Sequence, residues 1–360
     1  MQQHRVRSVR RTTRAALVTA VTMATAALGV TTAHATPAPD APVASTAADP
    51  GLREVSGDRF IGTAVNDNLL SDPTYTDILD TEFNSVTAEN VMKWDATEPS
   101  QGQFDFTAGD RLVEHAQANG QKVYGHTLVW HSQAPGWAQG LQGEQLRSAM
   151  INHVTEVVSH YRGQVERWDV VNEVLSDGGG FRDSFLYQQL GEDFIADAFR
   201  AAAEADPDAK LFINDYNTTG INAKSDTLYQ LVQDLLAEGV PVHGVGFQSH
   251  EIVGQIPGDI QQNLQRFADL GLEVVITELD IRTNTPASEQ ALQQQAEDYA
   301  TVTRACLAVD TCAGITVWGI SDKDSWVPGT FPGEGAACLW DENYQPKPAY
   351  EAVRSTLQNG

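Results

Sequence analysis

The sequence predicts an α/β fold, a (β/α)8 TIM barrel formed by a single domain. Short apolar runs rich in β-forming residues alternate along the chain with stretches of helical periodicity, and this alternation indicates a parallel sheet. The runs number eight. About 310 residues remain once the N-terminal region is set aside, which suits one closed barrel of eight strand–helix units.

Each predicted strand is a short apolar run with polar residues at its end. In chain order the runs occupy residues 60–65 (FIGTAV), 85–90 (SVTAEN), 122–130 (KVYGHTLVW), 165–173 (VERWDVVNE), 210–216 (KLFINDY), 244–250 (GVGFQSH), 273–280 (EVVITELD) and 315–320 (ITVWGI). Helical spacing between them is clearest in 228–236, where Leu and Val recur at i, i+3, i+4, i+7 and i+8, and in 146–161.

The first 35 residues are predicted to be a secretion signal peptide. Five arginines precede the apolar stretch AALVTAVTMATAALGV, and the small-residue pattern Ala33-His34-Ala35 follows it. A membrane anchor is the alternative, but the stretch is short and no second apolar run of spanning length follows. We therefore expect a secreted, extracellular protein that has no membrane association after cleavage. Residues 36–51 are predicted to be a flexible lead-in, and 52–360 the (β/α)8 barrel domain.

The charge of the mature chain excludes one class of partner. Without the five arginines of the leader, the 23 basic residues become 18, against 48 acidic ones, so the mature chain carries about −30. Nucleic acid is therefore not expected as a partner.

Two of the three cysteines are close together in the sequence. Cys306 and Cys312 enclose CLAVDTC, and in an exported chain they are predicted to form a disulfide. The alternative is two unpaired buried thiols; a metal site would need further ligands that this spacing does not supply. Cys338 is expected to be a free, buried thiol.

Polar and aromatic residues gather where the predicted strands end. In a (β/α)8 barrel these ends converge on one open mouth, where catalytic residues are found. A solvated acidic rim is the simpler explanation for these polar residues, but such a rim does not explain the tryptophans among them. By strand, from the second to the eighth, the ends are Glu89 and Asn90; His126, Trp130 and His131; Asn172 and Glu173; Asn214, Asp215 and Tyr216; Gln248 and His250; Glu278 and Asp280; and Trp318.

Two of these carboxylates, Glu173 and Glu278, each close a strand that is otherwise mostly apolar. Strands four and seven of an eight-stranded barrel face each other across the mouth, so a sugar ring fits between them. Glycoside hydrolysis uses such a pair, held about 5–5.5 Å apart in retaining enzymes and about 6.5–9.5 Å apart in inverting ones. Trp130, Trp318 and Trp326 are candidate platforms for sugar rings, although a single tryptophan is more often part of a core.

Two other classes of barrel remain as alternatives. A metal-dependent hydrolase would use His126, His131 and His250 with a carboxylate, but the first strand lacks the His-x-His that such barrels often carry. A barrel that only binds glycans would not need both glutamates. The expectation is an enzyme with no metal and no cofactor.

Several motifs make the chain similar to glycoside hydrolase family 10, a family of retaining endo-β-1,4-xylanases, from about residue 52 to the C-terminus. The motifs are TAENVMKWDATEP (87–99), GHTLVWHSQAPGW (125–137), WDVVNE (168–173), NDYNTTGINAKS (214–225), GFQSH (246–250), VVITELDIR (274–282), VWGISDKDSW (317–326) and YQPKPAY (344–350). The resemblance implies a monomer that cleaves internal bonds of xylan and binds xylo-oligosaccharides. Another β-1,4-glycan, such as cellulose, is the alternative substrate.

The resemblance also implies a role for each site residue. Glu173 would be the acid/base, Glu278 the nucleophile whose negative charge favours the protonated form of Glu173, and Asn172 a ligand of the sugar 2-hydroxyl. His250, with Asp280 beside it, would hydrogen-bond the nucleophile. Tyr216 and Asn217 would lie on the aglycon side of the cleft, toward the leaving group. The glycon side would be formed by Glu89, Asn90, Lys93, His126, Trp130, Gln248, Trp318 and Trp326.

Two positions depart from the family pattern. Glu251 directly follows QSH, where an apolar residue is expected, and Trp340 takes the place of a smaller side chain. Both are expected to affect the glycon side or the cleft entrance.

Overall fold

The computed structural model describes residues 49–360, and within this range the predicted barrel is confirmed. Eight parallel strands follow one another in chain order, and β10 pairs with both β1 and β9, which closes the ring. The barrel strands are β1 (Phe60–Val65), β2 (Ser85–Ala88), β3 (Lys122–Gly125), β5 (Arg167–Asn172), β6 (Lys210–Asp215), β7 (Gly244–Phe247), β9 (Glu273–Asn284) and β10 (Cys312–Val317).

Most predicted strands differ from the observed ones by a few residues at their ends, and three differ more. The run 122–130 is divided into β3 and the short β4 (Val129–Trp130), because the hydroxyl of Thr127 and the N–H of Leu128 both bond to a backbone carbonyl of β5. The run 244–250 is interrupted at Ser249, whose φ is 61°, and β8 (His250–Ile252) begins after it. The seventh run continues outside the barrel as far as Asn284, where β9 pairs with β8 and with β11 (Glu334–Gly335).

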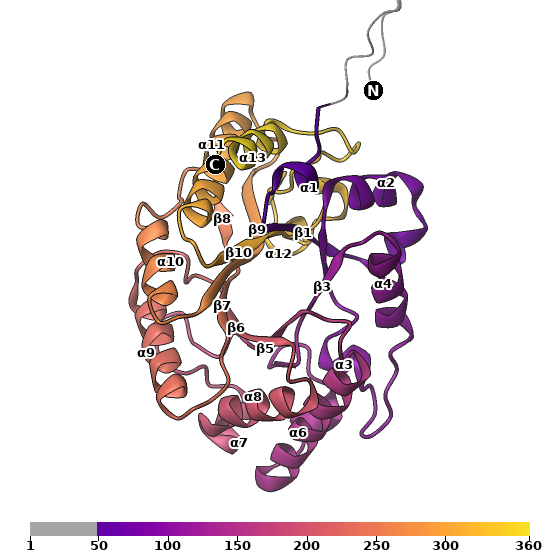
Figure 1. Cartoon of the computed structure of the whole chain (residues 1–360), viewed down its shortest axis with the longest axis vertical. Helices are drawn as coiled ribbons and strands as arrows, with labels where there is room; N and C mark the ends of the chain where they lie inside the picture. The colour runs from indigo at the N-terminus through magenta and orange to yellow at the C-terminus, as the bar shows by residue number, and fades with distance from the viewer. Residues whose placement is uncertain (1–48) are drawn as a thin grey trace, which may run out of the picture. The chain divides into compact units, whose positions relative to one another are not determined.

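The helices form a ring around the strands, as Figure 1 shows. The chain passes once around the barrel, and the last helix, α13 (Pro348–Asn359), packs against both α11 (Glu289–Leu307) and the first helix, α1 (Leu52–Val55). The Tyr350 hydroxyl also donates to the Glu82 carboxylate of α2 (3.1 Å). The helices are α1 (Leu52–Val55), α2 (Pro73–Glu82), α3 (Trp94–Thr97), α4 (Thr107–Ala118), α5 (Gly136–Gln139), α6 (Gly143–His160), α7 (Phe185–Leu190), α8 (Asp193–Ala205), α9 (Ala223–Ala237), α10 (Ile260–Ala268), α11 (Glu289–Leu307), α12 (Val327–Thr330) and α13 (Pro348–Asn359), with 3-10 turns η1 (Asp67–Ser71) and η2 (Asp322–Asp324).

A small apolar cluster fills the barrel interior. Phe60, Tyr124, Phe212 and Val275 come from strands that are not neighbours in the sheet, and they form a cluster separate from the main core. The ring centres of Phe60 and Tyr124 are 6.5 Å apart, and those of Tyr124 and Phe212 are 5.8 Å apart. Because residues of non-adjacent strands meet only across the lumen, the barrel is closed below its mouth by packed side chains. The larger core lies between the strands and the outer helices.

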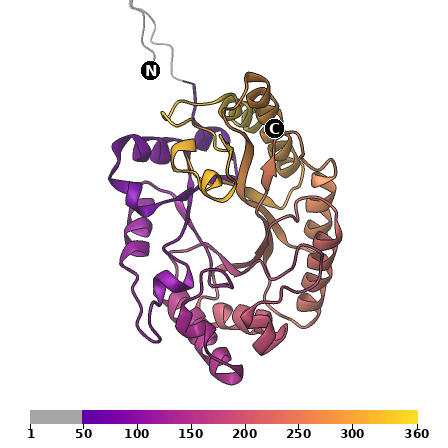
Figure 2. The same cartoon turned by 180° about the vertical axis from the view of Figure 1, so that it is seen from behind.

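Figure 2 shows the other face of the barrel, on which α12 and the chain around it lie toward the viewer at the edge of the ring. The segment that follows β10 passes over this face before α13 returns to the outside. All eight barrel strands are parallel, so their C-terminal ends share one face of the barrel.

The predicted Cys306–Cys312 disulfide is present, and Cys338 is free and buried. The predicted signal peptide (1–35) and most of the predicted lead-in (36–51) lie outside the described residues, so both remain predictions. Among helices of residues 49–360, none is both long enough and apolar enough to cross a bilayer.

Removing the disulfide by the double change Cys306→Ala and Cys312→Ala is expected to lower the free energy of unfolding by about 2 kcal/mol, because the bridge closes a short loop in the unfolded chain. Urea unfolding monitored by circular dichroism measures the loss. A reductant should shift the wild-type midpoint toward that of the double variant and leave the variant unchanged. A variant as stable as the oxidised wild type would contradict this expectation.

Candidate active site

A cleft of about 550 Å³ opens at the C-terminal ends of the strands. Every residue predicted to catalyse or to bind sugar lines it, although these residues are distributed over most of the sequence. They are Glu89, Asn90, Lys93, His126, Trp130, Asn172, Glu173, Tyr216, Gln248, His250, Glu278, Trp318 and Trp326. Asn217 also lines the cleft, and Asp280 lies behind it, in contact with His250 and Trp326.

Backbone hydrogen bonds between strand ends set the positions of the two glutamates. The N–H of Glu173 donates to Asn214 O (2.9 Å), at the end of the next strand. The N–H of Gln248 donates to Asp215 O (3.1 Å), and the N–H of Glu278 donates to Gln248 O (2.9 Å). Since β6 and β7 separate β5 from β9, the two glutamates stand on facing sides of the mouth.

Glu278 is buried, and both of its carboxylate oxygens have partners. Oε1 accepts a hydrogen bond from Asn214 Nδ2 (2.7 Å), and Oε2 lies 3.1 Å from His250 Nε2. Burial raises the pKa of Glu278, but the hydrogen bonds from His250 and Asn214 and the nearby imidazoles outweigh it, so the pKa lies below its ordinary value. The carboxylate is therefore ionised at neutral pH, as a nucleophile requires.

His250 lies between two carboxylates. Its Nε2 is 3.1 Å from Glu278 Oε2, and its Nδ1 is 3.0 Å from Asp280 Oδ2. Burial lowers the pKa of His250, but the two carboxylates outweigh burial and raise it to about 10. The ring is therefore an imidazolium at neutral pH, and its Nε2–H donates to Glu278.

Three amide side chains link Glu278 to Glu173. Asn214 Nδ2 donates to Glu278 and also to Asn172 Oδ1 (3.0 Å). Gln248 Nε2 donates to the same oxygen of Asn172 (3.1 Å) and to Glu173 Oε1 (3.3 Å). Because both donors meet the carbonyl oxygen of Asn172, its NH2 group is left to donate into the cleft.

The orientation of Asn214 is set by its neighbours. The Thr277 hydroxyl donates to Asn214 Oδ1 (2.7 Å), which directs the NH2 group of Asn214 toward Glu278 and Asn172. Gly246, in the strand between them, leaves room for this contact, since a Cβ there would come within 2.4 Å of Asn214 Oδ1. A side chain at position 246 would therefore push the amide out of line.

The backbone at Glu173 is held in an unusual conformation. Its φ is 56°, in the left-handed region, which costs a residue with a side chain about 1–2 kcal/mol. The N–H of Glu173 is bound by Asn214 O, and its carbonyl accepts from Arg182 Nε (2.8 Å). These contacts stabilise the turn that ends β5 and places the Glu173 side chain in the cleft.

Lys93 organises one wall of the cleft. Its Nζ donates to Gln133 Oε1 (2.7 Å) and Asn90 Oδ1 (3.0 Å), and lies 4.8 Å from the centre of the Trp130 ring. Burial lowers the pKa of Lys93 below its ordinary value, and burial likewise raises that of Glu89, which Lys93 partly opposes. This wall therefore offers closely spaced donors and acceptors suited to sugar hydroxyls.

His126 is held from below. Its Nδ1 lies 2.8 Å from Asp169 Oδ2, and the other oxygen of Asp169 accepts from the Tyr124 hydroxyl (2.9 Å). With Nδ1 engaged, Nε2 is the nitrogen available to the cleft. The Trp318 ring packs edge-on against His126, with ring centres 5.3 Å apart.

Trp326 is fixed by the same carboxylate that contacts His250. Its Nε1 donates to Asp280 Oδ2 (2.7 Å), and its ring lies edge-on to His250 with centres 4.8 Å apart. Trp318 also packs edge-on against His250, at 6.2 Å. Two indole rings thus border Glu278 in fixed orientations.

Four lining residues were not singled out from the sequence: Gln133, Arg282, Thr330 and Phe331. The position of Arg282 could have been predicted, because Glu278, Asp280 and Arg282 alternate along β9 and so share a face of the strand. Its guanidinium lies 4.1 Å from the centre of the Phe331 ring, and Nε donates to Glu334 (2.6 Å). Thr330 and Phe331 lie at the end of α12, where the sequence has no periodic pattern that predicts their position.

The histidines proposed as metal ligands are engaged elsewhere. His126 and His250 direct ring nitrogens at carboxylates, as described above. His131 packs edge-on to Trp130, and burial together with the charge of Arg182 lowers its pKa to about 4. Throughout residues 49–360, no group of three or more His, Cys, Asp or Glu side chains is arranged to hold a metal ion.

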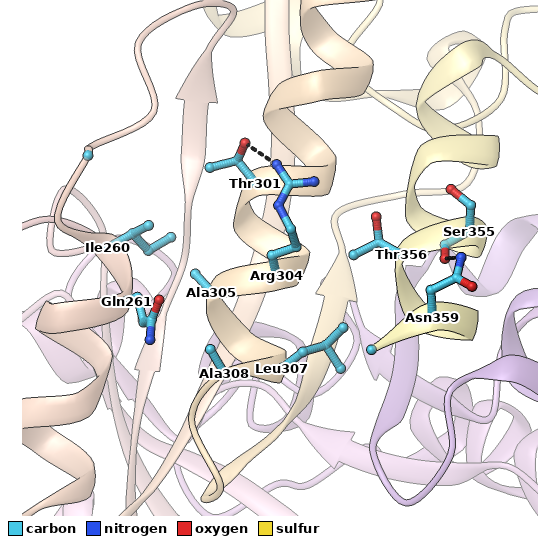
Figure 3. Close-up of a pocket in the computed structure, with 12 residues that line it drawn as sticks. Ile260, Gln261, Thr301, Arg304, Ala305, Leu307, Ala308, Ser355, Thr356 and Asn359 are labelled. Carbon is cyan, nitrogen blue, oxygen red and sulfur yellow. Dashed lines mark hydrogen bonds between the residues drawn. The ribbon is translucent and has the colours of Figure 1, made fainter.

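The larger hollow on the outside of the barrel has a different character. A groove of about 780 Å³ lies between α10, α11 and α13, and Figure 3 shows its side chains, including Arg304, which donates to Thr301. It contains no carboxylate, imidazole or aromatic side chain among its lining residues, so it lacks groups for acid–base chemistry. The cleft at the mouth is the candidate active site.

Comparison with known proteins agrees with this geometry. The model of the family described as Glycosyl hydrolase family 10 matches residues 51–356. The chain belongs to this family. The matched range includes all the cleft residues named above.

Named relatives of this family 10 chain share much of its sequence. It is 52% identical over 302 residues to an endo-1,4-beta-xylanase of Agaricus bisporus, covering 83% of this chain and 91% of the relative. It is 45% identical to the crystal structure of native xylanase 10B from Thermotoga maritima, with a TM-score of 0.84 over 86% of this chain and 98% of that one. A structure of xylanase 10B from Thermotoga petrophila RKU-1 in complex with xylobiose is 44% identical, with a TM-score of 0.85, over 87% of this chain and 98% of that one.

The two departures from the family 10 pattern lie outside the cleft lining. Trp340 is buried, with its ring packed against Phe83 (5.8 Å between centres) and Tyr350 (4.9 Å). Glu251 lies in β8, where burial raises its pKa. The expected effect on the cleft is therefore not direct; Trp340 fills the core between the last helix and α2.

Replacing His250 by glutamine is expected to move the acid limb of kcat/KM in this family 10 chain to higher pH. Glutamine can still donate a hydrogen bond, but it lacks the positive charge that favours the ionised form of Glu278, so Glu278 is protonated at a higher pH. A pH–rate profile between about pH 3 and 8 checks this. His115→Gln, which breaks a His–Asp contact far from the cleft (2.8 Å to Asp80), is the control. The same acid limb in both variants would count against the role of His250.

Proposed function

We propose that the protein is an endo-β-1,4-xylanase that hydrolyses internal bonds of xylan with retention of configuration. One observation carries this proposal: a buried, ionised Glu278 faces Glu173 across a cleft bordered by fixed indole rings. Support comes from family membership, from relatives named endo-1,4-beta-xylanase and from the xylobiose complex of a similar structure. Xylan and xylo-oligosaccharides are the proposed ligands.

In the first step, Glu173 donates its proton to the glycosidic oxygen while a Glu278 oxygen attacks the anomeric carbon. The bond to the leaving sugar breaks, and an ester between Glu278 and the remaining sugar forms. Esterification removes the negative charge that favoured protonated Glu173. Glu173 then accepts a proton from water, the water oxygen attacks the anomeric carbon, and the ester bond breaks to release ionised Glu278.

The neighbouring groups serve these two steps. His250 and Asn214 each bind one oxygen of Glu278 and hold the carboxylate in a fixed plane. The free NH2 group of Asn172 is available to the 2-hydroxyl of the sugar under attack, where hydrogen bonds strengthen in the transition state. Gln248 binds both Asn172 and Glu173, so it couples the position of the acid to that of the sugar ligand.

Xylose suits the cleft better than glucose does. The sugars differ in the exocyclic CH2OH group, and the two indole rings beside His250 are held by packing and by Asp280. A larger sugar would have to displace them. The family resemblance and this crowding favour xylan over cellulose.

One experiment tests the proposal directly. Purified protein is incubated with xylan and with soluble cellulose, and NMR identifies the first anomer released. We expect faster hydrolysis of xylan and net β product. Predominant cellulose cleavage would establish the alternative substrate, α product would exclude retention, and binding without new reducing ends would indicate a non-catalytic barrel. Activity is expected to survive exhaustive chelation; loss that zinc restores would favour a metal-dependent hydrolase.

We also propose that the enzyme is secreted and acts as a monomer outside the cell. The N-terminal pattern and the Cys306–Cys312 disulfide, which suits an oxidising compartment, support secretion. N-terminal sequencing of protein from the culture medium should begin at Thr36. Retention in the cell with an intact N-terminus would contradict secretion, and a dimeric mass in light scattering would contradict a monomer.

A further inference from the structure

A buried ion pair lies beside Tyr216, below the cleft lining. Lys224, in the first turn of α9, and Asp215, the last residue of β6, are both almost fully buried, with Lys224 Nζ 2.8 Å from Asp215 Oδ1. Neither side chain lines the cleft, so neither touches a bound sugar. Burying two charges is costly in free energy and is offset only when both have well-placed partners. Their partners all belong to the surroundings of Glu173.

Asp215 binds the backbone of the segment that follows Glu173. Its Oδ2 accepts from the N–H of Leu175 (3.2 Å), two residues after the acid, and its Oδ1 accepts from the N–H of Tyr216 (2.9 Å). Burial raises the pKa of Asp215 to about 6, and Lys224 opposes this rise. The lysine therefore helps to keep Asp215 an ionised acceptor for both backbone groups.

Lys224 is directed at the tyrosine that borders the acid loop. The Asn222 side chain caps α9 by accepting from the N–H of Lys224 (2.9 Å), which fixes the start of the helix. The Lys224 Nζ lies 3.4 Å from the centre of the Tyr216 ring and 3.7 Å from Asp177, in the loop after Glu173. A cation at this distance from an aromatic ring attracts it.

Tyr216 is connected to the backbone of Glu173 through the side chain of Arg182. Its hydroxyl accepts from Arg182 Nη2 (2.8 Å), and Arg182 Nε donates to the carbonyl of Glu173 (2.8 Å). That carbonyl belongs to the left-handed turn with φ 56°. A strained conformation persists only where surrounding contacts hold it.

We propose that the Asp215–Lys224 pair positions Glu173 for proton transfer. The pair holds the turn that carries Glu173 and the hydrogen-bonded Tyr216 and Arg182 side chains beside it. The two residues are positioning residues that act through Leu175 and Tyr216. The inference rests on the proposed function, since it assigns Glu173 the role of acid. Loosening the turn would displace the proton donor but leave Glu278, which is held by Asn214 and His250, in place.

This difference defines the test. Dinitrophenyl β-xylobioside has a leaving group that needs no proton, whereas xylan requires one. For Lys224→Met, kcat/KM on xylan is expected to fall roughly tenfold to a hundredfold, part of what general acid catalysis contributes, and kcat/KM on the dinitrophenyl substrate by less than about threefold. The double change Asp215→Asn with Lys224→Met removes both charges and is expected to show the same selective loss if the single variant does not fold.

The control is Lys347→Met, which breaks another buried lysine–aspartate contact (3.0 Å to Asp322), away from the acid loop. It is expected to change both substrates by the same factor. Equal losses on both substrates in a folded Lys224 variant would overturn the inference, because they would indicate only a structural role. A wild-type protein that does not cleave xylan would instead refute the proposed function.

Discussion

Replacing Glu278 by alanine is expected to lower kcat/KM by about five orders of magnitude on every substrate, activated aryl xylosides included. In the proposed mechanism this side chain supplies the oxygen that bonds to the anomeric carbon. Losses of this size are typical when a covalent nucleophile is removed. Because His250 and Asn214 would then have no carboxylate between them, the alanine variant also leaves the positive charge of His250 without one of its partners.

Rates are measured on xylan and on dinitrophenyl β-xylobioside. Mass spectrometry of the protein then checks whether the ester intermediate can be trapped. Glu273→Ala is a control on the same strand: Glu273 begins β9 at the opposite end of the barrel, where it pairs with Arg167 (3.1 Å) and Lys210. It is expected to reduce stability with little effect on kcat. Activity of the Glu278 variant above about one hundredth of wild type would show that the nucleophile lies elsewhere.

The fold was predictable because its signals are local. Each barrel strand is an apolar run of a few residues, and the polar residue that ends it lies at the mouth whatever the exact strand length. Glu173 and Glu278 illustrate this point: each follows a short run that contains two or more β-branched apolar residues, and strand order alone places them across the barrel. The family motifs then suggested roles that the order of strands does not supply.

The contacts between these residues could not be predicted in the same way. The sequence indicates that Asn214 ends a strand, but its link to both Glu278 and Asn172 depends on the pairing of β5 with β6, which includes a register shift between Asp169 and Val171. A shift of one residue reverses which side chains face the lumen. Such irregularities arise from packing of the whole barrel.

The rest of the cleft wall was missed for a related reason. Phe331 reaches the cleft from the segment after β10, where α12 is four residues long and no repeat of apolar residues exists. Arg182 lies nine positions after Glu173 in the chain, and only the folded turn brings its guanidinium to the Glu173 carbonyl. Loops that cross a barrel mouth are positioned by tertiary contacts, so their side chains are found only in a structure.

Replacing Glu173 by alanine is expected to give a selective defect. On xylan, kcat/KM should fall by about 10²–10⁴, because the leaving oxygen is no longer protonated. On dinitrophenyl β-xylobioside, kcat/KM should stay near the wild-type value, since that constant reports only the steps up to the glycosyl-enzyme ester. The kcat on the same substrate should fall, because Glu173 is also the base that activates water in the second step.

Azide separates these two roles. The alanine leaves space beside the anomeric carbon, and a small anion that enters it needs no base, so azide should restore kcat of Glu173→Ala and give the β-xylosyl azide. The same addition should leave Glu278→Ala inactive toward this product, since no ester forms for azide to attack. If the Glu173 variant lost both substrates equally, or if azide rescued the Glu278 variant with β product, the two roles would be assigned to the wrong carboxylates. The left-handed turn and its contact with Arg182 involve the backbone of Glu173, so they remain in the alanine variant. The variant therefore removes the carboxyl group and leaves the turn in place.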